Sequence, residues 1–353
     1  TYLFEHGVAS TLVWNDDRSK ANLFATIGPA CAGGVVLSGH TDVVPEGGEA
    51  WTGSPWKLRK KGDRLYGRGT CDMKGFDAIV LAAVPSMVAA NLNVPIHIAL
   101  SYDEEVGCLG APSLVEAMAT KVGRPQAVIV GEPTQMAIVN GHKGSLSFFT
   151  SIKGHPAHSS RIDQGVSAVM VGARLVTWLE DRMLENARRA DPGNPFRPNY
   201  TTLHCGMING GTAANVVAGT CDFVTDIRAI PEEDPVAYRD AYEGYIKTQI
   251  LPHMHAVAKD TSVDVIDRGY VPSLNPQPGD EAELLTKCIT GRENCEVVSY
   301  GTEAGIFQKA GWSSVVCGPG NIAQAHRKDE YISEDQFSAG QLFIERLISH
   351  LSV

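Results

Sequence analysis

The sequence lacks several features that would define its class at once. Its eight cysteines show no paired C-x-x-C spacing, and the longest largely apolar run, residues 79–90, is too short to span a bilayer and contains Pro85. No positively charged start followed by an apolar segment is present, so no secretory signal is visible. Lys and Arg (30) are outnumbered by Asp and Glu (40), and the net charge of −10 argues against nucleic-acid and anionic-membrane partners.

The cysteines point to a reducing compartment. A disulfide framework is unusual in a chain of this length, so reduced and mostly buried thiols are expected, which fits a cytoplasmic protein. Cys71, beside Asp72, raises the alternative of a cysteine nucleophile, as does Cys108. A structural neighbour of a metal ligand is the preferred interpretation of Cys71, because no base is spaced to activate its thiol.

The 353 residues exceed one compact core, so two domains are expected. The first part alternates apolar strands with helical patterns, which predicts an α/β fold with a mostly parallel sheet. Strands are expected at 21–27, 35–38, 94–101 and 127–130, and helices at 76–90 and 111–120. The same texture returns late in the chain, with helices at 280–290 and 333–351 and a strand at 313–317.

The middle of the chain has a different pattern. From residue 145 the expected order is strand, helix, strand, strand, helix, strand, which is typical of a split βαβ, ferredoxin-like α+β domain. We therefore expect a discontinuous catalytic domain formed by 1–143 and 271–353, with residues 144–270 inserted into it.

Charged side chains recur where apolar runs end. Strand ends in an open α/β sheet meet at one carboxyl edge, where such folds place their chemistry. Imidazole together with carboxylates is a ligand set for divalent metal ions. The sequence thus predicts a metallohydrolase with two metal ions, built from His40, Asp42, Asp72, Glu104, Glu105, Glu132 and His326.

Each of these residues also has an ordinary alternative. His40 and Asp42 lie two apart at a strand end and face the same side, which suits a metal-bound imidazole held by a carboxylate, but also a surface turn. Asp72 lies in the glycine-rich GRGTCDMKG, where turn residues are common. Glu104 and Glu105 form an acidic pair of the kind that is usually solvated. As a pair they also offer one metal ligand and one free general base for amide hydrolysis.

The motifs SGHTDVVP, GRGTCDMKG, SYDEEVGCLGAP, VGEPT, KGHPAHSS, GGTAANVV and DIRAIP resemble, in order and spacing, those of the dinuclear zinc amidohydrolase and peptidase family. That family includes aminoacylases, desuccinylases and glutamate carboxypeptidases. The resemblance covers nearly the whole chain. HTDVVP, NGHKG and GTEAG are most similar to the acetylornithine deacetylases of this family. The resemblance also implies several dozen residues, including a helix, before the first strand, which this sequence lacks.

The resemblance implies two Zn²⁺ ions per subunit, which Co²⁺ can replace. His40, Asp72 and Glu132 would bind one ion, and Asp72, Glu105 and His326 the other. Glu104 would be the general base and Asp42 would support His40. A cis peptide bond is expected after Asp72.

Three residues of the inserted domain acquire roles by the same resemblance. His158 would reach the active site of the partner subunit and stabilise the oxyanion, with His155 as a nearby alternative. Asn215 and Arg228 would bind the substrate's α-carboxylate, for which the arginine fork is suited. The inserted domain would then form the interface of a homodimer and a lid.

The expected reaction is metal-dependent hydrolysis of N-acetyl-L-ornithine to L-ornithine and acetate, a step of arginine biosynthesis. Glu303, in YGTEAG, is expected to recognise the basic side chain of the substrate. Alternatives within the family are succinyl-diaminopimelate desuccinylase, a broader N-acyl-L-amino-acid deacylase, and a carboxypeptidase. A cysteine hydrolase and a non-enzymatic metal-binding scaffold are the alternatives outside it.

Overall fold

The computed structural model describes residues 1–48 and 50–353, which form two compact units. The larger unit contains Thr1–His142, Leu274–Val297 and Thr302–Val353. The smaller unit contains Lys143–Ser273 and Val298–Gly301. These limits lie within three residues of the expected domain limits, except that 298–301 groups with the smaller unit.

The larger unit is built on a mixed sheet whose middle strands are parallel. The strand order is β1-β2-β6-β3-β7-β14-β8-β13, and β6, β3, β7 and β14 run parallel to one another. Strands β3, β6, β7 and β14 are buried along their whole length, which explains their unbroken apolar runs. The strands span Ser10–Trp14 (β1), Ala21–Ile27 (β2), Val35–His40 (β3), Ile96–Ser101 (β6), Ala127–Pro133 (β7), Ile138–His142 (β8), Cys295–Val298 (β13) and Ser314–Gly318 (β14).

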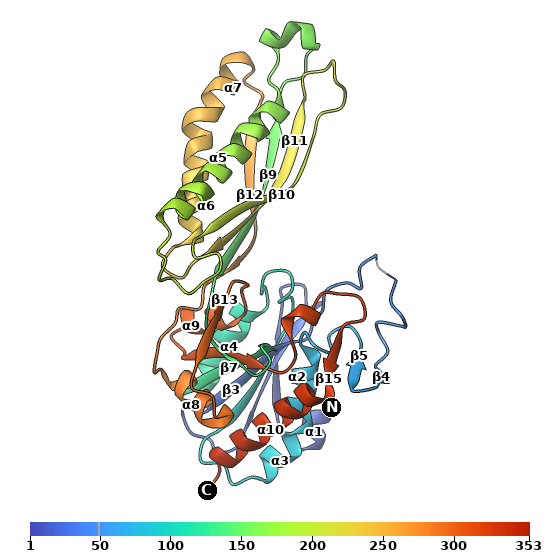
Figure 1. Ribbon diagram of the computed structural model, residues 1–353, viewed down its shortest axis with the longest axis vertical. Coiled ribbons are helices and arrows are strands. Elements are labelled where there is room, and N and C mark those ends of the chain that lie inside the picture. Colours follow the sequence, from blue (N-terminus) through green and yellow to red (C-terminus); the bar gives the residue numbers. More distant parts are fainter. Residues whose placement is uncertain (49) are drawn as a thin grey trace. The chain divides into compact units, whose positions relative to one another are not determined.

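Helices cover both faces of this sheet (Figure 1). Helices α2, α8 and α10 pack on one face, and α4 and α9 pack on the other. The helix expected at 76–90 is two helices, because Pro85 lies in the first turn of a new helix after α2 ends. The helices span Tyr2–Glu5 (α1), Lys74–Ala82 (α2), Val84–Ala89 (α3), Ala111–Val122 (α4), Glu281–Thr290 (α8), Ala304–Lys309 (α9) and Glu334–His350 (α10).

A second, three-stranded sheet in the larger unit was not expected from the sequence. Its order is β15-β5-β4, with strands Tyr331–Ser333 (β15), Arg64–Tyr66 (β5) and Arg59–Lys61 (β4). These strands are only three residues long and rich in charge, so they give no clear periodic signal.

The smaller unit has the expected split βαβ order. Its antiparallel sheet has the order β10-β11-β9-β12, with helices α5, α6 and α7 packed on one face. Burial alternates along β9, as it does in a strand with one covered face. The elements span Gly144–Lys153 (β9), Ala168–Arg189 (α5), Thr202–Gly210 (β10), Thr220–Ala229 (β11), Pro235–Tyr245 (α6), Leu251–Val257 (α7) and Ser262–Val271 (β12).

None of the helices formed by the described residues combines the length and the apolar composition needed to cross a bilayer.

Candidate metal centre

The carboxyl edge of the parallel strands collects the residues predicted from the sequence. His40 is the last residue of β3, and Glu132 lies near the end of β7. Glu104 and Glu105 follow the end of β6. Because these strands are parallel neighbours, their ends bring the side chains to one place.

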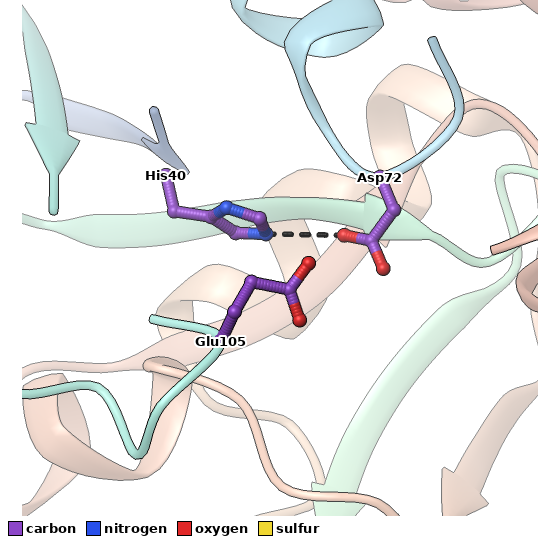
Figure 2. Close-up of side chains that lie close together, drawn as sticks. All are labelled: His40, Asp72 and Glu105. Atoms are coloured by element: carbon purple, nitrogen blue, oxygen red, sulfur yellow. Dashed lines mark hydrogen bonds and ion pairs between the residues drawn. The ribbon is translucent and has the colours of Figure 1, made fainter. Parts of the chain in front are cut away.

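Asp72 lies between the two histidines. Its Oδ1 is 3.0 Å from His40 Nε2 and its Oδ2 is 3.2 Å from His326 Nε2, so each carboxylate oxygen faces a different imidazole. Figure 2 shows the side chains of His40, Asp72 and Glu105 converging, with the contact between His40 and Asp72 marked. The Asp72–Met73 peptide bond is cis, as the resemblance implies.

The remaining carboxylates complete two groups. His326 Nε2 is 3.0 Å from Glu105 Oε2, and His40 Nε2 is 3.6 Å from Glu132 Oε1. Donor atoms of His40, Asp72 and Glu105 lie within 4.8 Å of one another, as do those of His40, Glu104 and Glu132. Ligand atoms around one tetrahedral zinc at about 2.0–2.2 Å lie about 3.4 Å apart. The contacts here have that spacing.

Asp42 fixes both the imidazole and the acidic pair. Its backbone oxygen is 3.1 Å from His40 Nδ1, and its Oδ1 is 3.6 Å from the same nitrogen. The two carboxylate oxygens accept hydrogen bonds from the backbone N–H groups of Glu104 and Glu105, each at 3.1 Å. Asp42 therefore contacts His40 largely through its backbone, and its carboxylate positions the loop that carries both glutamates.

Desolvation and like charge dominate the electrostatics of the glutamates. Burial raises the pKa of Glu104 to about 8, and the neighbouring carboxylates of Glu303, Glu105 and Asp72 act in the same direction. Burial likewise raises the pKa of Glu132, followed by the charge of Asp72. The charge of the nearby His40 offsets this crowded negative charge only in part.

The histidines respond in the opposite sense. Hydrogen bonds to Asp72 and then to Glu105 raise the pKa of His326 to about 10. Burial acts against protonation of His40, yet the Asp72 and Glu132 carboxylates raise its pKa well above the usual value. Burial also opposes ionisation of Asp72, but the two imidazoles lower its pKa. Both imidazoles thus lie against carboxylates that could share a divalent cation with them.

The donor set fits a metal. Glu105 Oε1 is buried and has no hydrogen-bond partner among the described residues, although Oε2 contacts His326. A buried carboxylate oxygen without a partner is costly, and coordination would satisfy it. The set of imidazole nitrogens and carboxylate oxygens suits zinc, and the site keeps Glu104 beside it as a further carboxylate.

A buried ion pair that sequence reasoning missed holds two loops of the site together. Arg68 Nη1 is 2.7 Å from Glu330 Oε2, and both side chains are no more than 2% exposed. Glu330 Oε1 accepts hydrogen bonds from the backbone N–H groups of Cys71 (2.9 Å) and Asp72 (3.1 Å). Arg68 also donates to the backbone oxygen of Arg327, beside His326. The pair ties the Asp72 loop to the His326 loop.

Glu303 does not have the placement expected of a residue that binds the substrate side chain. It is 1% exposed, and its carboxylate accepts hydrogen bonds from Ser38 Oγ at 3.0 Å and from Ser101 Oγ. Both carboxylate oxygens are therefore occupied inside the protein. The predicted contact with an ornithine ammonium group would require this carboxylate to leave the two serine hydroxyls.

The thiols do not support a cysteine nucleophile. Burial raises the pKa of Cys71 to about 12, so its reactive thiolate is scarce near neutral pH. Burial also raises the pKa of Cys108 well above its usual range. Cys108 Sγ instead donates to Glu104 Oε1 at 3.3 Å, which helps to fix that carboxylate.

The other predicted residues belong to the smaller unit. His158 Nδ1 is 2.8 Å from Ser160 Oγ, and the backbone N–H of Ser159 donates to the backbone oxygen of Asn215 at 3.0 Å. The segments that carry His158 and Asn215 therefore lie side by side. Arg228, on β11, forms an ion pair with Asp226 at 2.9 Å.

Comparisons with known proteins agree with this architecture. The model of peptidase family M20/M25/M40 matches residues 36–350, and the chain belongs to that family. An acetylornithine deacetylase of Myxococcus xanthus is 36% identical over 334 residues, covering 94% of this chain and 84% of that protein.

Solved structures share the fold at low sequence identity. The M20 family metallo-carboxypeptidase Sso-CP2 of Sulfolobus solfataricus is 18% identical, with a TM-score of 0.77 over 98% of this chain and 91% of that chain. A dinuclear metal-binding peptidase of the same family, the YXEP protein of Bacillus subtilis, is 14% identical. Its TM-score is 0.61, and the match covers 99% of this chain and 90% of that one.

Replacing Glu330 tests the ion pair. Glu330→Gln keeps the size of the side chain but leaves the Arg68 charge buried without its partner, so the free energy of unfolding should fall by about 3–5 kcal/mol. Glu334→Gln is the matched control, because Glu334 forms an exposed ion pair with Lys60, and its loss should cost at most about 1 kcal/mol. Urea denaturation measures both. Equal, small effects of the two changes would show that the buried pair does not stabilise these loops.

Proposed function

We propose that this chain is a zinc-dependent amidohydrolase that converts N-acetyl-L-ornithine and water to L-ornithine and acetate. The observation that carries the proposal is the convergence of two imidazoles and four carboxylates at the sheet edge, with Asp72 between the histidines. The choice of substrate rests on the 36% identity with the Myxococcus enzyme over nearly the whole chain.

We assign His40, Asp72 and Glu132 to one ion and Asp72, Glu105 and His326 to the other. The four short contacts among these residues, between 3.0 and 3.6 Å, support this division. Two zinc ions per subunit, or cobalt in their place, would polarise the amide carbonyl and acidify a water molecule. Asp42 and the Arg68–Glu330 pair keep the donors in position.

Glu104 is the proposed general base. It accepts a proton from the attacking water and delivers it to the leaving amine nitrogen, so the proton balance closes within one turnover. Its partly buried position beside the proposed ligands suits a group that must both accept and release a proton during the reaction. The Asp42 hydrogen bond to its backbone and the Cys108 contact to its carboxylate hold it in place.

The smaller unit supplies the remaining groups of the proposal. His158 stabilises the oxyanion in the active site of a partner subunit, and Asn215 and Arg228 bind the substrate's α-carboxylate. The edge strands of the smaller unit carry exposed apolar side chains, namely Met207 and Ile208 on β10 and Ile266 on β12, which supports a homodimer through this unit.

Other members of the family catalyse related reactions. A desuccinylase, a broader N-acyl-amino-acid deacylase or a carboxypeptidase would use the same donors and the same base. A panel of acyl groups and amino acids distinguishes these. A metal-binding scaffold would have no use for Glu104, a partly buried carboxylate held beside the proposed ligands.

Removing the base tests the reaction. Glu104→Gln should lower kcat for N-acetyl-L-ornithine by about 10²–10⁴-fold, since general acid–base catalysis contributes that much. Asp103→Asn, one residue earlier, removes an ion pair with Lys20 and should leave kcat unchanged. Acetate release measures both. Full activity of the Glu104 variant would remove the proposed base.

Metal binding should release protons. The pKa values of Glu104 (about 8) and His326 (about 10) are raised without metal, so both groups hold protons at pH 7. Metal ions bind the deprotonated ligands, so zinc affinity should rise from pH 6 to pH 8. Calorimetry at pH 7 in two buffers of different ionisation enthalpy counts the protons. The His326→Gln variant should release about one proton fewer than the wild type when zinc binds. A buffer-independent heat would contradict the account.

Mixing two variants tests whether His158 acts in trans. Glu104→Gln and His158→Ala should each be nearly inactive alone. After subunit exchange of an equal mixture, half of the dimers contain one complete site, so activity should return to about a quarter of the wild-type value. No recovery, with mixed dimers demonstrated by native mass spectrometry, would place His158 in its own subunit's site.

A further inference from the structure

The three-stranded sheet of the larger unit gathers cations on one face. Arg59 and Lys61 alternate along β4, and their paired residues on β5 are Tyr66 and Arg64. Paired residues of neighbouring strands project from the same face, so three cations share it. The opposite face carries Leu65 and Ile332, which pair with each other.

This arrangement is electrostatically unfavourable by itself. Lys61 lies directly opposite Arg64, and like charges in that position destabilise a sheet. The guanidinium groups are nevertheless held in place. Arg64 lies 4.2 Å from the ring centroid of Tyr331, and Arg59 lies 5.4 Å from that of Tyr66. Stacked guanidinium groups lose less freedom when they bind an oxyanion.

The cationic face borders a hollow of about 640 Å³ that the candidate metal centre also borders. His326, whose Nε2 contacts Asp72 and Glu105, is among its lining residues. Among the described residues that line it, five are cationic, in a chain with a net charge of −10: Arg59, Lys61, Arg64, Arg327 and Lys328.

The single carboxylate of the lining is already engaged. Asp329 accepts hydrogen bonds from the backbone N–H and the hydroxyl of Thr52 and forms an ion pair with Arg59 at 3.3 Å. Arg64 Nε lies 3.9 Å from the exposed carboxylate of Asp63, whereas, within the described part of the chain, Lys61 and Arg327 have no carboxylate within ion-pair distance. The positive charge of the hollow is therefore only partly balanced by the protein.

We propose that this hollow, whose lining also includes Arg327, is a binding site for a small oxyanion, a carboxylate or phosphate group, held by Lys61 and Arg64. An anion there relieves the repulsion across β4 and β5 and receives charge-assisted hydrogen bonds from a preorganised arginine. Because His326 borders the hollow, the bound anion lies beside the metal centre.

Two kinds of ligand carry such an oxyanion. One is a free anion that occupies the hollow and inhibits. The other is an acidic acyl group, such as a succinyl group, on a substrate whose amide lies at the metal centre. The second source rests on the proposed amidohydrolase function, and the first does not.

A binding experiment tests the site without any assumption about catalysis. Inorganic phosphate and succinate are titrated into zinc-loaded protein by calorimetry at constant ionic strength, because exposed charges are screened by salt. Lys61→Gln/Arg64→Gln should weaken binding by about tenfold or more, that is, by about 1.4 kcal/mol or more. Lys60→Gln is the matched control. It removes a cation from the same strand but from the opposite face, where Lys60 pairs with Glu334.

The outcomes separate the alternatives. If the anion binds only to the zinc ions, its affinity will be equal in the wild type, the control and the double variant, and that result would overturn the proposal. Absence of anion binding to all three proteins would overturn it as well. Loss of phosphate inhibition in the double variant, with unchanged hydrolysis of N-acetyl- and N-succinyl-L-ornithine, identifies a free anion. A tenfold loss of kcat/KM for the succinyl substrate alone identifies the acyl group. Unchanged thermal melting confirms that the double variant is folded.

Discussion

Two imidazoles and four carboxylates converge near the ends of β3, β6 and β7, and all of them except the half-exposed His326 are buried or partly buried. Burying one uncompensated carboxylate costs several kcal/mol, and burying several together adds mutual repulsion. Hydrogen bonds within the larger unit offset part of this cost. Asp42 binds the backbone of the acidic pair, and Glu330 binds the backbone of the Asp72 loop. The repulsion among the carboxylates that these hydrogen bonds do not offset favours the binding of a cation.

The cost of burying these charges also explains why the strands and the loops of the fold differ in what they contribute to the site. The parallel strands are buried on both faces and provide fixed positions, while the loops at their ends carry the charge. Arg68 and Glu330 are 262 residues apart in the sequence and join two loops, so neither the Asp72 loop nor the His326 loop is positioned alone. The geometry of the site therefore depends on the folding of the larger unit. A substitution at a supporting residue such as Glu330 also affects the position of Asp72, because Glu330 binds the backbone N–H group of Asp72.

Sequence reasoning succeeded where the signal is local. Strand β2 has the expected limits, and the structure brings together His40, Glu105 and Glu132, which were singled out because each lies where an apolar run ends. It failed where the signal is a distant contact. Nothing near Glu330 reveals its partner Arg68, and a carboxylate in a glycine-flanked loop gave no hint that Ser38 and Ser101 enclose Glu303. The short strands β4 and β5 were missed because three residues show no period.

The most direct test of the account is a zinc titration of metal-depleted protein, with acetate release from N-acetyl-L-ornithine measured at each point. We expect no release without metal, and activity that rises with bound zinc to a plateau at about two ions per subunit, one for each imidazole. Release that persists in metal-depleted protein would contradict metal-dependent hydrolysis. A plateau without release, with two ions bound, would contradict the proposed substrate.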